Sequence, residues 1–297
     1  PYWGLRDYGV AGQLGLEPTP EEYVANMVEV FSLVRELLAD DGTLWLNLGD
    51  SYAGNRNDRD ALEKYGQEHG MGGGHRITQS RRRDNAPCPR SDVRVPGLKP
   101  KDLVGIPWMV AFALRADGWW LRSDIIWHKP NPMPESVRDR PTSAHEHIFL
   151  LAKLERYYYD AEAIREPDSG QQHARNVFAG APSLEPSGGL RHAHTSLWGD
   201  ESRNGAGRNK RNVWTIPSQP YSRAHFATYP PDLIKPCILA GSRPGDIVFD
   251  PFLGSGTTAQ VAQELGRQWV GCELNVGYGK LQEERTAQHG LVLDGTA

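Results

Sequence analysis

The chain of 297 residues is poor in cysteine and has no long hydrophobic run. Its three cysteines, Cys88, Cys237 and Cys272, lack the spacing of a zinc site or a disulfide framework, which favours unpaired thiols in a reducing cytoplasm. The longest apolar stretches, such as 106–114, are too short to span a membrane. No signal peptide is visible, although Pro1 is not a natural first residue and residues before it could contain one. These absences favour a cytoplasmic protein without membrane spans.

The composition permits a folded core but indicates long polar loops. Apolar residues make up 38% of the chain, and the mean hydropathy is -0.57. The net charge of -4 argues against a uniformly basic coat for nucleic acid. The segment 51–101 nevertheless contains eleven basic and six acidic residues, so it is locally positive by five charges. A basic insertion on an acidic body is typical of a surface that meets a polyanion.

Alternating helical and strand patterns predict an α/β protein. Thr19 and Glu22 form a capping box around Pro20, which predicts a helix that starts at Pro20 and ends at Gly42. A second helix, strongly apolar and largely buried, is expected over 102–116, and a third over 231–240. Strands are expected over 44–48, 119–127 and 146–152, with 157–159 continuing the sheet.

Two polar, glycine-containing stretches interrupt this pattern. The segment 51–101 is predicted to be a basic loop or insertion, and the segment 166–212 a second insertion with few core residues. No internal repeat is visible. The simplest architecture is a single α/β domain over 1–297 whose sheet is interrupted by these two insertions.

The run 250–258, Asp-Pro-Phe-Leu-Gly-Ser-Gly-Thr-Thr, has the pattern of a cofactor site. It follows an apolar strand at 246–249 and opens a helix at 257–265, and the next strand, 268–273, ends at Glu273. A glycine-rich turn from strand to helix, followed by an acid after the next strand, is typical of an adenosine-cofactor site in an open α/β sheet. The turn also fits the dinucleotide pattern, so NAD is one candidate ligand.

Asp250 helps to separate the candidate ligands. A carboxylate just before the turn would face a pyrophosphate unfavourably, whereas the ammonium and sulfonium groups of S-adenosylmethionine would benefit from it. Glu273 would accept hydrogen bonds from the two ribose hydroxyls of either ligand. The residues therefore favour S-adenosylmethionine over NAD and over a turn with no ligand.

The run resembles the cofactor motif of the amino-group DNA methyltransferases, Asp-Pro-Phe-x-Gly-x-Gly-Thr, at every position. The resemblance implies a Rossmann-like methyltransferase sheet with two polar insertions. It implies that S-adenosylmethionine is held by Asp250, Pro251, Phe252, Gly254, Gly256, Thr257 and Glu273. Phe226, in a segment similar to the element that closes over the methionine end of the cofactor, is a further candidate.

Pro1-Tyr2-Trp3-Gly4 resembles the second half of the catalytic motif of this family, Asp-, Asn- or Ser-Pro-Pro-Tyr. The chain is then expected to be truncated at its N-terminus, with Pro1 and Tyr2 remaining from the catalytic corner. The acceptors of this corner would hold both hydrogens of an exocyclic amine, so that the methyl group transfers in line from sulfur. Tyr2 would stack on a flipped-out base. This order of motifs, catalytic first and cofactor last, is a circular permutation of the usual methyltransferase arrangement.

The resemblance extends to the segment 125–131, next to the target-base pocket in the family. It makes Lys129 and Trp127 candidates for contact with base or phosphate, although Trp127 taken singly is more typical of a core residue. Trp3 is a further candidate for the base, and the run Arg81-Arg82-Arg83 for DNA phosphates. The 166–212 insertion is where the family carries target recognition. No metal site is predicted.

The sequence therefore predicts a site-specific DNA methyltransferase that modifies an exocyclic amine. Cytosine N4 is favoured over adenine N6, because the continuation after Pro1-Tyr2 is more similar to the serine-containing form of the motif. Double-stranded DNA is the expected partner. A restriction endonuclease is a candidate second partner, and a homodimer is a candidate assembly. Three alternatives stay open: an NAD-dependent oxidoreductase, an RNA or protein amine methyltransferase, and a non-catalytic DNA-binding fragment with an exposed sheet edge.

Overall fold

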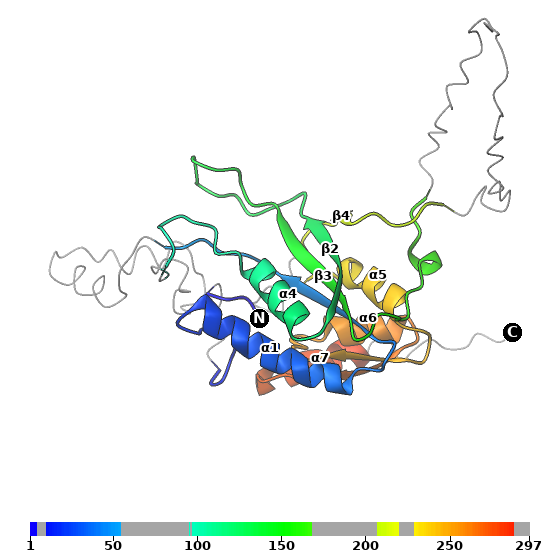
Figure 1. Ribbon diagram of the computed structural model, residues 1–297. Coiled ribbons are helices and arrows are strands. Elements are labelled where there is room, and N and C mark those ends of the chain that lie inside the picture. Colours follow the sequence, from blue (N-terminus) through cyan, green and yellow to red (C-terminus); the bar gives the residue numbers. More distant parts are fainter. Residues whose placement is uncertain (5–9, 55–94, 96, 168–206, 220–228, 288–297) are drawn as a thin grey trace, which may run out of the picture. The chain divides into compact units, whose positions relative to one another are not determined.

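The computed structural model describes residues 1–4, 10–54, 95, 97–167, 207–219 and 229–287 (Figure 1). Backbone contacts divide the chain into two compact units. Unit 1 comprises Pro1–Asp160 and Asn212–Ala297, and unit 2 comprises Ala161–Arg211. In the part of the chain so described, no helix is both long and apolar enough to cross a membrane.

The first helix, α1, spans Pro20–Leu37 and begins as its capping box predicts. The Thr19 side chain accepts a hydrogen bond from the Glu22 amide at 3.2 Å. The helix ends at Leu37 rather than at the predicted Gly42, because Leu38 adopts an extended conformation. Gly42 instead closes the following turn by donating its amide to the Ala39 carbonyl at 2.9 Å.

Replacing Thr19 by alanine is expected to lower the free energy of unfolding by about 1 kcal/mol, because the Glu22 amide loses its side-chain acceptor. Urea denaturation followed by circular dichroism measures the difference. Thr19→Ser keeps a hydroxyl and serves as the control. Equal stability of the alanine and serine variants would show that the cap contributes nothing.

The larger sheet contains four strands in the order β1-β3-β2-β4. Strand β3 is antiparallel to both β1 and β2, and β4 is parallel to β2. The strands span Thr43–Leu48 (β1), Trp120–His128 (β2), His145–Ala152 (β3) and Val213–Thr215 (β4).

The expectation that residues 157–159 continue the sheet is wrong, since they form no strand. Their side chains pack individually instead. The Arg243 guanidinium lies 4.0 Å from the centroid of the Tyr158 ring, and the Tyr159 ring stacks on Trp45 with the centroids 6.4 Å apart. Aromatic packing therefore accounts for these tyrosines without a ladder of backbone hydrogen bonds.

The helix α4 spans Ile106–Ala116, so it begins four residues later than expected. Gly105 just before it has a left-handed φ of 85°. The Asp50 carboxylate accepts hydrogen bonds from the Gly105 amide at 3.0 Å and the Ile106 amide at 3.1 Å, and so caps the helix there. Burial raises the pKa of Asp50 despite these hydrogen bonds. The helix is also less buried than expected, because Trp108 and Phe112 are 37% and 47% exposed.

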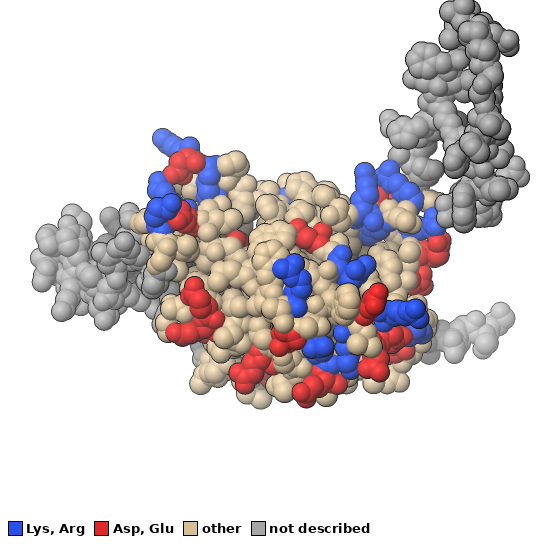
Figure 2. Space-filling view, viewed as in Figure 1, with Lys and Arg blue, Asp and Glu red and all other residues tan. Residues whose placement is uncertain are grey.

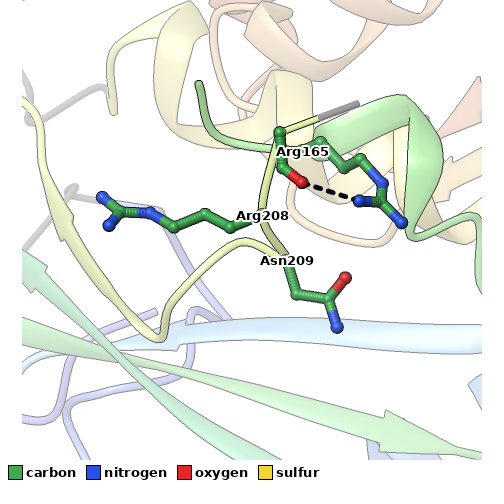
Figure 3. A pocket seen from close by; sticks show the side chains of 4 residues that line it. Arg165, Arg208 and Asn209 are labelled. Carbon is green, nitrogen blue, oxygen red and sulfur yellow. Dashed lines mark hydrogen bonds between the residues drawn. The ribbon is translucent and has the colours of Figure 1, made fainter. Parts of the chain in front are cut away.

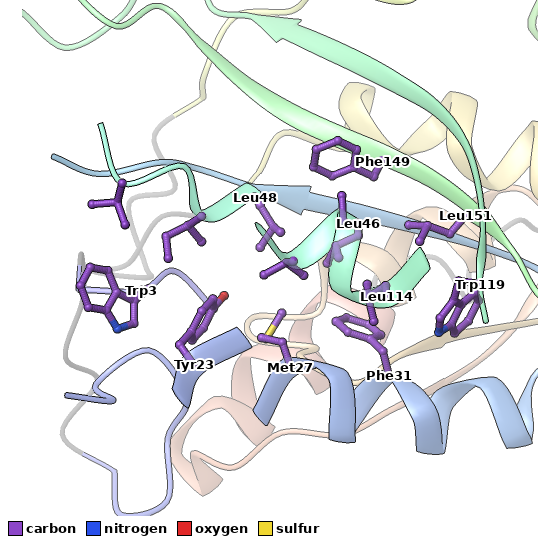
Figure 4. Packing of buried hydrophobic residues seen from close by; sticks show 14 of the residues in the cluster. Trp3, Tyr23, Met27, Phe31, Leu46, Leu48, Leu114, Trp119, Phe149 and Leu151 are labelled. Carbon is purple, nitrogen blue, oxygen red and sulfur yellow. The ribbon is translucent and has the colours of Figure 1, made fainter. Parts of the chain in front are cut away.

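Helices cover both faces of the larger sheet. On one face, α1 and α4 pack on β1 and β3 around Tyr23, Phe31 and Phe149 (Figure 4). On the other face, Ile148 of β3 packs with residues of α5, which spans Pro231–Gly241. Adjacent residues of β3 thus point to opposite sides, as the alternation of a strand requires.

The strands of a second, two-stranded sheet flank the predicted cofactor turn in the sequence. Strand β5 (Ile247–Asp250) and strand β6 (Gln268–Gly271) are parallel and connected through α6 (Thr257–Glu264). The short helix η4 (Val276–Tyr278) and α7 (Gly279–Ala287) come next. The expected strand–turn–helix–strand order is present, but β6 ends two residues before Glu273.

Strands β1 and β5 do not pair with each other in the part of the chain described. Near their starts, Asp41 and Arg243 form an ion pair at 2.9 Å. Near their carboxyl ends, Asn47 contacts Tyr2, and Tyr2 and Asp250 line the same cavity. The strands described here thus form two sheets rather than the single one expected, and the two strand edges line one cavity.

In unit 2, the short helix η2 (Glu162–Ile164) lies next to an isolated bridge between Glu166 and Arg208. Arg165 donates a hydrogen bond to the Gly207 carbonyl at 2.8 Å, beside a cavity of about 250 Å³ lined by four residues (Figure 3). Basic side chains gather in this unit, among them Arg211, which pairs with Glu166 at 3.1 Å (Figure 2). Most of the predicted 166–212 insertion lies outside the described residues.

Candidate active site

One large cavity of unit 1 brings together the two motifs that lie at opposite ends of the sequence. Its volume is about 1370 Å³. Pro1 and Tyr2 of the predicted catalytic corner line it, and so do seven residues of the run 250–258 and the acid after it, namely Asp250, Pro251, Phe252, Gly254, Ser255, Thr258 and Glu273. The lining includes Asn47 and Asp250 at or near the carboxyl ends of β1 and β5, and the carboxyl ends of strands are the usual ligand site of an α/β sheet.

The glycine turn holds Glu273 at the edge of this cavity. Gly254 has a φ of 55°, in the left-handed region that favours glycine. Its amide donates to Glu273 Oε2 at 2.8 Å, while Glu273 Oε1 accepts from the Asn275 amide at 2.7 Å. These two hydrogen bonds fix the carboxylate beside the turn, where the sequence predicted a ribose acceptor.

Asp250 organises the start of the turn from inside the protein. Its Oδ1 accepts a hydrogen bond from the Phe252 amide at 2.9 Å. Its Oδ2 accepts from the Tyr229 hydroxyl at 3.0 Å and from the Thr258 hydroxyl. Burial, together with the charge of Asp250, raises the pKa of Tyr229 well above its usual value, so the phenol stays protonated as a donor. Asp250 therefore combines a structural role with a negative charge at the cavity wall.

Ser255 carries an unsatisfied polar group in this wall. Its Oγ is buried and has no hydrogen-bond partner among the described residues. Buried polar atoms normally have a partner, and a bound ligand can supply one. Together with the carboxylates of Asp250 and Glu273, this hydroxyl forms a donor and acceptor set that fits an adenosine cofactor carrying a positive charge.

Tyr2 lines the same cavity, with its hydroxyl held by polar side chains. It contacts Asn47 Oδ1 at 3.1 Å and Glu146 Oε2 at 3.0 Å. The backbone of the same corner is fixed by Tyr23, whose buried hydroxyl donates to the Pro1 carbonyl at 2.7 Å. The predicted catalytic corner thus has a defined position next to the cofactor turn.

The structure places four other predicted residues away from the cavity. Trp3 and Trp127 are 5% and 4% exposed, and their indole nitrogens donate to the backbone carbonyls of Glu17 and Ile216. These two rings are core residues and offer no surface to a base. Among the cofactor candidates, Gly256 and Thr257 face α7 instead of the cavity, through Gln282 and Arg285 respectively.

Lys129 does not point freely toward solvent either, because it pairs with Glu146. Four further candidates, Phe226, Arg81, Arg82 and Arg83, lie outside the described residues. No group of His, Cys, Asp and Glu in the described ranges could hold a metal ion.

Sequence reasoning missed three residues that the structure brings to the site, Tyr229, Thr258 and Glu146. Thr258 lies inside the run 250–258, so it was within reach of the motif comparison. The roles of all three depend on contacts between distant segments, such as the 144 residues between Tyr2 and Glu146, and no local pattern indicates such contacts.

A family model described as "DNA methylase", for N6 and N4 methyltransferases, matches residues 1–284. The chain belongs to this family. The type II methyltransferase M.Cfr9I of Citrobacter freundii is 45% identical over 292 residues, which cover 96% of this chain and 80% of the relative. The type II methyltransferase M.SmaI of Serratia marcescens is 47% identical over 286 residues, 96% of this chain and 81% of the relative.

Solved structures support the same fold for this DNA methylase. The PvuII DNA methyltransferase (cytosine-N4-specific) aligns with a TM-score of 0.58 and 16% identity, over 100% of this chain and 78% of that one. A putative DNA modification methylase of Thermus thermophilus, complexed with S-adenosyl-L-methionine, aligns with a TM-score of 0.52 and 21% identity, over 93% and 84%. The expected Rossmann-like methyltransferase fold is confirmed.

Family membership also decides between the two candidate cofactors. The cofactor of this DNA methylase is S-adenosylmethionine, as predicted, rather than NAD. Its substrate is DNA. The sequence-based choice of a methyl-transfer enzyme over an oxidoreductase is therefore confirmed.

Proposed function

We propose that this methylase transfers the methyl group of S-adenosylmethionine to N4 of a cytosine flipped out of the DNA duplex. The observation that carries the proposal is the shared cavity, which is lined by Pro1 and Tyr2 as well as by Asp250 and Glu273. A donor at the glycine turn and an acceptor base at Tyr2 would then occupy one cavity. Positioning two reactants in this way is the main contribution that a transfer without a covalent intermediate requires.

The residues of the turn would hold the cofactor, which supplies a methyl group on a positively charged sulfur. Glu273 would accept hydrogen bonds from the ribose hydroxyls, and Ser255 would gain the partner that it lacks among the described residues. The negative charge of Asp250 favours a cation nearby. Phe252 packs edge-on against Phe31, with the centroids 6.3 Å apart, and provides a rigid apolar wall.

In the same cavity, Tyr2 would stack on the flipped base. The exocyclic amine of the base would then face the methyl donor. The proposal of cytosine is supported by the sequence after Pro1-Tyr2, which resembles the serine-containing form of the motif. Adenine N6 is the alternative acceptor.

The test is a transfer assay with isotopically labelled S-adenosylmethionine and unmethylated duplex DNA. The DNA is digested to nucleosides and analysed by mass spectrometry. Label in N4-methylcytosine is expected. Label in N6-methyladenine would overturn the choice of base, and DNA without label would overturn the proposed function.

We also propose a cognate restriction endonuclease of the same specificity, because the relatives are type II methyltransferases. Plasmid DNA from cells that express the protein is then expected to resist an endonuclease that recognises the same site and cleaves it only when it is unmethylated. Cleavage equal to that of plasmid from cells without the protein would contradict this.

A further inference from the structure

A partly buried ion pair lies behind Tyr2. Lys129 Nζ pairs with Glu146 Oε1, and the two side chains are only 20% and 17% exposed. The ammonium also lies 4.2 Å from the centroid of the Trp127 ring, in a cation–π contact. Partly buried ion pairs are weak contributors to stability, because the loss of hydration offsets the attraction. This pair is therefore better explained by what it holds than by the stability it gives.

The second oxygen of Glu146 holds Tyr2. The Tyr2 hydroxyl can donate its one hydrogen to Glu146 Oε2 at 3.0 Å or to Asn47 Oδ1 at 3.1 Å. A carboxylate is the stronger acceptor of the two. Asn47 is itself oriented by its amide, which donates to the His147 carbonyl at 3.0 Å. The hydroxyl end of the ring is thus fixed by the adjacent strands β1 and β3.

The ring itself rests on Gly49. A Cβ at that position would lie 3.0 Å from Tyr2 Cε1 and 3.2 Å from Cδ1, closer than almost all real contacts. The absence of a side chain at Gly49 therefore lets the ring lie against the backbone that follows β1. Tyr2 also lines the large cavity.

We propose that Glu146 and Lys129 are positioning residues that fix the Tyr2 ring for stacking on the target base. Lys129 holds one oxygen of Glu146 and thereby presents the other oxygen to the tyrosine hydroxyl. This inference rests on the proposed function, because it assumes that Tyr2 stacks on the base. It assigns Lys129, predicted from the sequence to contact base or phosphate, to support of the tyrosine.

A double-mutant cycle between Glu146 and Tyr2 tests the proposal on the full-length protein. Glu146→Gln weakens the acceptor and breaks the ion pair, and Tyr2→Phe removes the hydroxyl. Each variant is expected to lower kcat for methyl transfer about tenfold, because a loosened ring positions the base poorly. The double variant is expected to be no slower than the slower single variant. Glu135→Gln, which breaks the exposed ion pair with Arg140, is the matched control and should leave kcat unchanged.

A second readout separates positioning from a general structural role. DNA with 2-aminopurine at the target position reports base flipping and stacking through its fluorescence. Glu146→Gln and Lys129→Met are expected to change this signal in the complex while leaving the melting temperature within a few degrees of the wild type. Lys129→Arg keeps the charge and should restore much of the wild-type signal.

The outcomes distinguish this inference from the proposed function. If the wild type methylates DNA but the effects of the two substitutions multiply to about 100-fold, Glu146 does not act through Tyr2 and the inference fails alone. An unchanged 2-aminopurine signal in both variants would overturn it as well. If the wild type transfers no methyl group to DNA, the proposed function fails first.

Discussion

Replacing Glu273 by alanine is expected to raise the dissociation constant for S-adenosylmethionine about 100-fold, because charged hydrogen bonds contribute roughly 1.5–3 kcal/mol each. In the proposed complex, the substitution removes the carboxylate that accepts hydrogen bonds from the two ribose hydroxyls. The substitution also releases the Gly254 and Asn275 amides that Glu273 holds at 2.8 and 2.7 Å. Isothermal titration calorimetry with the full-length protein measures the change.

Two controls define what Glu273 contributes. Glu264→Ala removes an acid at the end of α6, whose carboxylate accepts a hydrogen bond from Gln260 at 2.9 Å on an exposed part of the helix, and should leave cofactor affinity unchanged. A cofactor analogue without ribose hydroxyls should bind the wild type weakly and should lose little more affinity in Glu273→Ala. A full 100-fold loss with that analogue would show that Glu273 acts by shaping the turn and not by binding the ribose.

The cofactor half of the site could be predicted from the sequence because its signals are local. Glycines at 254 and 256 with left-handed φ angles, the strand before them and the acid at 273 all fall within a short stretch. The capping box of α1 could be recognised for the same reason. Local backbone requirements restrict the residue types that can satisfy them.

The remaining features depend on which distant segments meet. Strand β5 and the turn could be placed, but no local pattern indicated that Tyr229 and Thr258 would both bond Asp250. Helix α4 starts late because Asp50, 55 residues before Gly105, caps it. The burial of Trp3 and Trp127 likewise follows from packing on other elements. The sequence alone therefore does not distinguish a core aromatic residue beside a motif from one that contacts the ligand.

Replacing Asp250 by alanine is expected to lower the free energy of unfolding by about 3 kcal/mol, because several donors lose a partly buried, charged acceptor. The Phe252 amide and the Tyr229 hydroxyl would be left without the carboxylate, and Thr258 would lose its acceptor. Chemical denaturation measures the change. Asp246→Ala, at the start of the same strand, removes an acid with exposed partners and should cost about 0.5 kcal/mol or less.

Asp250→Asn separates the charge of this residue from its hydrogen bonds. An amide oxygen can still accept from one set of donors, so the variant should be more stable than Asp250→Ala. Its neutral side chain no longer favours the cationic cofactor, so affinity for S-adenosylmethionine should fall while affinity for a neutral adenosine changes little. If both ligands weaken equally, Asp250 serves the site only through the shape of the turn. A selective loss of the cationic ligand would instead assign the preference for a sulfonium donor to this carboxylate, the feature that separated the two cofactors in the sequence.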